Sequence, residues 1–95
     1  MEEYHPSERE LPDVTETEIH LAQEIQRVTE RHPDVFACKD LTLLREGAQY
    51  NVTLTCQIAK SKTLDEVHQI ISAIEATLFR YLEQLRRITI HAEPR

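Results

Sequence analysis

The last third of the chain, residues 63–94, constrains the fold more than any other stretch. It predicts one amphipathic helix followed by a short strand over residues 87–92. Thr63 and Glu66 form a capping box, which marks the start of the helix. The apolar residues at helical spacing are Leu64, Val67, Ile71, Ile74, Leu78, Leu82 and Leu85. In the strand, alternation sends Ile88 and Ile90 inward and Thr89, His91 and Glu93 outward.

The preceding two thirds supply a first helix and two strands. Thr15 and Glu18 form another capping box, and Pro33 ends the helix that follows. Its apolar residues are Ile19, Leu21, Ala22, Ile25 and Val28. Residues 35–44 are rich in β-forming side chains, and the only glycine of the chain, Gly47, marks a turn. Residues 50–59 alternate cleanly, which predicts a strand with one buried and one polar face.

The two cysteines fall on these two strands. In the second strand, Cys56 shares the buried face with Val52, Leu54 and Ile58. In the first strand, regular alternation around Leu41 and Leu43 places Cys38, Asp40 and Thr42 on the polar face. The two thiols are then expected on opposite faces, where they cannot bond to each other.

The element order α-β-β-α-β predicts an α+β fold of the ferredoxin-like (metallochaperone-like) type. Strand 50–59, the long helix and strand 87–92 form a β-α-β unit, so these strands are expected to be parallel with a right-handed crossover. The result is a three-stranded mixed sheet with both helices on one face. The other sheet face is small, polar and uncovered, and a homodimer is the economical expectation.

Length and charge narrow the function classes. A chain of 95 residues holds one modest core, so we expect a domain over residues 14–95 and a flexible polar tail or linker over residues 1–13. The net charge of −6 argues against nucleic acid and against anionic membrane surfaces. No stretch is apolar enough for a membrane span or a secretion signal, so we expect a cytoplasmic protein with reduced cysteines.

Three side chains are the best candidates for binding a metal: His68, His91 and Glu93. His91 and Glu93 are two residues apart on one strand face, and His68 lies early on the long helix. Imidazole and carboxylate ligands suit Zn²⁺ and similar divalent ions. The alternatives are a solvated strand end for the first two and a packed, hydrogen-bonded histidine for His68. No nucleophile motif or phosphate-binding loop occurs, so we expect no enzyme activity.

The chain resembles the cytosolic C-terminal domain of cation diffusion facilitators, the zinc and manganese efflux transporters. The matching pieces are K-D-L-T-L-L-R-E-G at 39–47, L-D-E-V-H at 64–68 and I-T-I-H-A-E-P at 88–94. The resemblance implies a V-shaped regulatory homodimer that binds metal near its interface and helps to gate a membrane domain. It also implies that His68, His91 and Glu93 stand at positions of metal ligands.

Two positions depart from the family pattern. Lys39 stands where many members of the family have a histidine, and Thr55 stands where several members have a second histidine. A charged lysine repels cations, so one metal site is expected rather than a two-metal cluster, with Cys38 as a candidate substitute ligand. Two other functions remain open: a metal-free dimerisation module, and a small-molecule-binding regulatory domain. The chain is either a domain excised from a transporter or a free-standing relative that buffers, senses or delivers metal.

Overall fold

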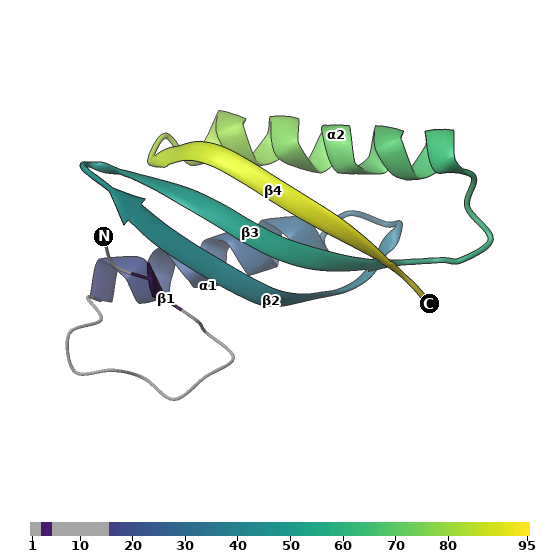
Figure 1. Ribbon diagram of the computed structural model, residues 1–95, viewed down its shortest axis with the longest axis horizontal. Coiled ribbons are helices and arrows are strands. Elements are labelled where there is room, and N and C mark those ends of the chain that lie inside the picture. Colours follow the sequence, from purple (N-terminus) through teal and green to yellow (C-terminus); the bar gives the residue numbers. More distant parts are fainter. Residues whose placement is uncertain (1–2, 5–15) are drawn as a thin grey trace.

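The computed structural model describes residues 3–4 and 16–95, and Figure 1 shows a twisted sheet with two helices packed behind it. The elements are β1 (Glu3–Tyr4), α1 (Glu16–Glu30), β2 (Val35–Glu46), β3 (Gln49–Ile58), α2 (Leu64–Tyr81) and β4 (Leu85–Pro94). From residue 16 onward this is the predicted α-β-β-α-β order. The predicted tail, residues 1–13, lies outside the described residues except for β1.

The strand order of the sheet is β1-β2-β3-β4. β2 and β3 form an antiparallel hairpin, and β3 pairs in parallel with β4 after the α2 crossover, as predicted. β4 is therefore an edge strand of the described sheet. The three predicted strands are confirmed with one addition, because β1 pairs with β2 at Leu43 and Leu44.

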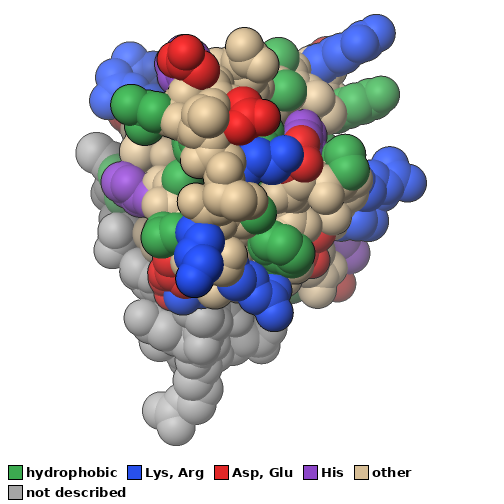
Figure 2. Space-filling view, turned by 90° about the vertical axis from the view of Figure 1, so that its right-hand side faces the viewer, with side chains coloured by type: hydrophobic (Ala, Val, Ile, Leu, Met, Phe, Trp, Pro, Cys, Tyr) green, Lys and Arg blue, Asp and Glu red, His purple; other side chains and the backbone are tan. Residues whose placement is uncertain are grey.

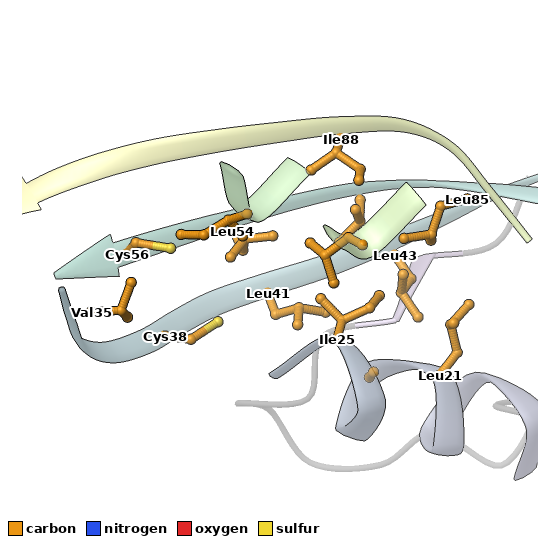
Figure 3. Packing of buried hydrophobic residues seen from close by; sticks show 14 of the residues in the cluster. Leu21, Ile25, Val35, Cys38, Leu41, Leu43, Leu54, Cys56, Leu85 and Ile88 are labelled. Carbon is orange, nitrogen blue, oxygen red and sulfur yellow. The ribbon is translucent and has the colours of Figure 1, made fainter. Parts of the chain in front are cut away.

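The core between sheet and helices is aliphatic (Figure 3). Ile25, Leu43, Leu54 and Leu78 are completely buried. Tyr50 is the one aromatic residue among the buried core side chains of the described part. Because burial of one such aliphatic side chain stabilises the fold by about 1.5–3 kcal/mol, this layer holds both helices on one sheet face. No helix of the described residues lies over the opposite face.

The apolar stripe of α2 is shorter than predicted. The helix ends at Tyr81, so Leu82 is its C-cap residue, and Leu85 already belongs to β4. The pairing with β3 begins earlier in the sequence than the predicted strand start at residue 87, because the amide of Tyr50 donates to the carbonyl of Gln84 at 2.8 Å. At the other end Leu64 is 86% exposed, so this residue does not contribute to the core.

The hairpin between β2 and β3 closes at the only glycine. Gly47 has φ +65° and opens a two-residue loop, where a type II′ turn requires positive φ. A Cβ added to Gly47 would meet no atom within 4 Å, so the backbone conformation, and not the space, selects glycine here.

A bulge in β2 overturns the predicted face of Cys38, whereas Leu41 and Leu43 are buried as predicted. Lys39 is in register with Thr55 and Thr42 with Thr53, so two residues, Asp40 and Leu41, stand against Leu54 alone. Asp40 adopts φ +54°, which is unusual for a residue other than glycine. The extra residue reverses the alternation on its N-terminal side.

The bulge brings the two cysteines together on the buried face. Cys38 is the register partner of Cys56, and their exposed fractions are 7% and 0%. Figure 3 shows both at the end of the core that also contains Val35. The prediction that they lie on opposite faces was wrong, since it assumed an unbulged strand. Both are free thiols.

Candidate metal site

His91 and Glu93 lie on the sheet face opposite α1 and α2, the two helices of the described part of the chain. Alternation along β4 buries Ile88, whereas His91 is exposed and Glu93 half-buried. In the parallel ladder His91 stands beside Thr55, and Glu93 stands beside Gln57. The structure therefore places these two candidates on a common face, in successive outward positions of the strand.

The carboxylate of Glu93 has two partners. Lys39 Nζ lies 2.8 Å from Glu93 Oε1, and Gln57 Nε2 donates a hydrogen bond to the same oxygen at 2.8 Å. These contacts hold the pKa of Glu93 below its ordinary value, with the hydrogen bond from Lys39 as the largest cause. Glu93 in turn raises the pKa of Lys39. An ion pair thus lies beside His91.

Lys39 reaches this face because of the bulge in β2. One row across the sheet reads Lys39 on β2, Thr55 on β3 and His91 on β4. It carries an ammonium, a hydroxyl and an imidazole. The side chains of Lys39 and Glu93 are 43% and 40% exposed, so solvent reaches both members of the pair.

His68 lies in the other layer of the molecule. It occupies the second turn of α2 and is exposed. α2 begins at the same end of the molecule at which β4 finishes (Figure 1). The helix packs on the buried sheet face with Ile88, whereas His91 and Glu93 lie in the alternate, outward positions of β4. Across the described ranges, 3–4 and 16–95, no three His, Cys, Asp or Glu side chains gather closely enough to hold a metal ion. One protomer therefore does not bring the three candidates together.

Figure 2 shows the end of the molecule that contains these segments. Acidic, basic and histidine side chains are intermixed on it, with hydrophobic groups scattered between them. The capping box predicted at the start of α2 lies here and is confirmed. Glu66 N donates to Thr63 Oγ1 at 3.1 Å, and Thr63 N donates to Glu66 Oε1 at 2.8 Å. The first turn of α2, which directly precedes His68, is therefore well anchored.

Cys38 does not substitute as a ligand on the outer face, because it points into the core. Burial raises the pKa of Cys38 to about 12, with further contributions from Cys56 and Glu30. Burial likewise raises the pKa of Cys56 to about 11. Glu30 Oε2 accepts a hydrogen bond from the Cys38 amide at 3.0 Å. These thiols stay protonated near neutral pH, which makes them weak nucleophiles and weak ligands.

A separate hollow of about 480 Å³ lies between α1 and α2. Its walls are mixed, with apolar, basic and hydroxyl groups. They include Val28, Ile74 and Leu82, together with Arg27, Arg31, Thr77 and Tyr81. It is the place where the small-molecule alternative would be tested, and the three candidate ligands do not line it.

The fold and the site together define a class of protein. Within the described residues it is a small ferredoxin-like domain with one polar sheet face that neither helix covers and a His-x-Glu pair on an edge strand. None of the helices in the described ranges has both the length and the apolar character needed to cross a membrane.

The family model described as "Cation efflux protein, cytoplasmic domain" matches residues 18–95. The chain belongs to this family, which comprises the cytoplasmic domains of cation transporters and is not a class of enzymes. The family thereby places the domain in the cytoplasm. No curated protein matched the sequence.

Solved structures of the same fold include transporter C-terminal domains. The metal-bound C-terminal domain of the CzcD transporter from Thermotoga maritima is 22% identical, with a TM-score of 0.81, covering 85% of this chain and 94% of that one. A doubly substituted MamM C-terminal domain is 18% identical, with a TM-score of 0.81, covering 85% and 98%. A nickel form of another MamM variant is 19% identical, with a TM-score of 0.77, covering 81% and 98%.

Proposed function

We propose that this chain is the homodimerising regulatory domain of a divalent-cation efflux transporter. In this proposal it binds a zinc-like ion near the dimer interface through His68, His91 and Glu93. The observation that carries the proposal is the family match, which runs from residue 18 to residue 95 and includes all three candidates. The membrane domain of such a transporter is the second partner that the proposal implies.

The geometry favours a site shared between two protomers. His68 lies on the helix layer, whereas His91 and Glu93 lie on the uncovered sheet face, and one chain does not unite them. In a two-fold dimer, His68 of one protomer can approach the sheet face of the other, and the symmetry then creates two equivalent sites. Such a shared site would make metal binding and dimer geometry interdependent.

The ligand types favour a borderline divalent ion. Two imidazoles and one carboxylate are common zinc ligands, and a fourth position would remain for water. Related domains support divalent binding, because the CzcD domain is described as metal-bound and MamM variants are described in nickel and cadmium forms. Zinc is therefore the first ion to test.

The test is native mass spectrometry of the purified chain with and without stoichiometric zinc. We expect a dimer that takes up zinc and a His91→Ala dimer that does not. His20→Ala is the matched control, because His20 is an exposed histidine on α1. A dimer that ignores zinc, or that binds it equally well after His91→Ala, would contradict the proposed site.

A second candidate function is a metal-free dimerisation module. The contact between Lys39 and Glu93 favours it, because a charged side chain of the protein itself already neutralises the carboxylate. In that case zinc would change neither the mass nor the thermal stability of the dimer. By contrast, a ligand present at 100 times its Kd raises the free energy of unfolding by about 2.7 kcal/mol.

A further inference from the structure

The Glu93 carboxylate is already paired with a cation, the ammonium of Lys39. Lys39 Nζ and Gln57 Nε2 both contact Glu93 Oε1, each at 2.8 Å. A metal ion that uses this carboxylate must share it with the ammonium or displace it. Lys39 does not act as a ligand in its place, because the nitrogen of an ammonium carries no free lone pair.

The competition is built into the sheet and does not depend on a flexible loop. The bulge at Asp40 turns Lys39 outward, and the register places it opposite Thr55 in the row that ends at His91. Gln57 holds Glu93 from the strand between them. The ammonium is therefore tethered next to both predicted ligands of β4.

The ion pair is weak enough for a metal ion to displace it. Both side chains are about 40% exposed, and an exposed pair of this kind is screened by water. A divalent ion at Glu93 would still feel the repulsion of the nearby ammonium. These two effects lower metal affinity without abolishing it.

We propose that Lys39 is the residue that sets the metal affinity of this site, acting as a tethered cation that competes with the metal for Glu93. This inference rests on the proposed function and deepens it, since it assigns the regulation of binding to one side chain. The domain then responds only to cation concentrations well above those that the same ligands would detect without Lys39.

The experiment is calorimetric titration of zinc into the dimeric full chain and into three variants. Lys39→Gln removes the charge, and Lys39→Arg keeps it. Lys62→Gln is the matched control, because Lys62 also forms a partly exposed ion pair, with Asp34 Oδ1 at 3.4 Å. Circular dichroism confirms that each variant is folded, and His91→Ala in each background identifies the site.

We expect Lys39→Gln to bind zinc roughly tenfold more tightly, which corresponds to about 1.4 kcal/mol, while Lys39→Arg and Lys62→Gln remain near the wild type. Equal, His91-dependent binding by the wild type and Lys39→Gln would overturn this inference and leave the proposed function standing. Binding by Lys39→Gln alone would support the inference and overturn the proposed function for the natural chain. Binding by neither would overturn both.

Discussion

Asp40 shows how one backbone conformation changes the chemistry of a strand. Asp40, with φ +54°, forms the bulge at which β2 has one residue more than β3. This bulge turns Cys38 toward the core and Lys39 toward solvent. A regular strand would have done the reverse. Because of this bulge, the thiol of Cys38 lies on the buried face and the ammonium of Lys39 lies on the outer face. The surface that carries His91 therefore has a fixed positive charge.

Deletion of Asp40 should be tolerated, unlike most deletions within a strand. Without it, Leu41 would oppose Leu54 while Lys39 kept its partner Thr55, so every side chain would stay on its present face. We expect the free energy of unfolding to change by at most about 1–2 kcal/mol, since one left-handed residue is removed.

The matched control is deletion of Thr53 from β3, a strand with regular burial alternation. That deletion would move Val52 or Leu54 to the wrong face, so we expect the protein not to fold. Urea denaturation followed by circular dichroism compares the two variants. Loss of the native spectrum on deletion of Asp40 would show that the bulge is needed for folding.

At this scale the sequence predicted some contacts and missed others, for physical reasons. The capping box of Thr63 was predictable because both partners are three residues apart. The contact of Lys39 with Glu93 was not, because it depends on the bulge and on two strand registers. Asp40 tolerates positive φ more readily than most residues, and this was the only local signal of the bulge.

At the scale of whole elements, β3 and α2 were the easiest to predict. β3 alternates without interruption, and it buries Val52, Leu54, Cys56 and Ile58 as predicted. β2 buries residues at irregular spacing (Val35, Cys38, Leu41 and Leu43), so a period of two assigned the face of Leu41 and Leu43 correctly but not that of Cys38. The observed end of α2 and start of β4 differ from the predicted ones. The pairing of β4 with β3, which is distant in the sequence, fixes where β4 starts.

The N-terminal cap of α2 makes a measurable contribution to stability. Thr63→Ala removes the acceptor for the amide of Glu66, and we expect a loss of about 1 kcal/mol in the free energy of unfolding. Thr63→Ser keeps the hydroxyl and should restore most of it. Urea denaturation measures both variants, and equal stability of wild type and Thr63→Ala would contradict the assigned role.

The paired thiols of β2 and β3 predict a loss of stability at alkaline pH. Their folded pKa values, about 12 for Cys38 and about 11 for Cys56, lie above the ordinary value of 9.0. Above pH 9 the unfolded chain therefore binds fewer protons than the folded chain, and the free energy of unfolding falls as pH rises through about 9–12.

The comparison is the wild type against Cys56→Ala, by urea denaturation in steps from pH 8 to pH 11. The variant is expected to be less stable at pH 8 because it leaves a small cavity, but to lose stability less steeply. Parallel slopes for the two proteins would show that the Cys56 thiol ionises as easily in the folded chain as in the unfolded one.

At the scale of the whole molecule, the separation of His68 from β4 gives a direct test of a shared site. In a dimer that mixes His68→Ala and His91→Ala chains, one site would lose both histidines and the other would keep both. We expect each variant alone to bind no zinc and the mixed dimer to bind one equivalent, measured by native mass spectrometry.

Mixed dimers can be recognised by a mass tag on one chain, and a mixture of wild-type chains is the control for subunit exchange. If the site were contained within one protomer, the mixed dimer would bind no zinc. This outcome would mean that all ligands come from one protomer and that metal binding does not depend on the geometry of the dimer.

The parallel pairing of β3 with β4 also has a consequence for the order of folding. The hairpin of β2 and β3 closes through two residues, whereas β4 must wait for the whole of α2, and such long-range pairing forms slowly. As an edge strand, β4 is also the natural place for partial opening. We expect its amide protons to exchange with deuterium sooner than those of β3, as NMR can measure. The strand that carries His91 and Glu93 would then be the last strand to pair during folding and the first to separate on partial opening. It is therefore the part of the sheet that a bound cation could stabilise most.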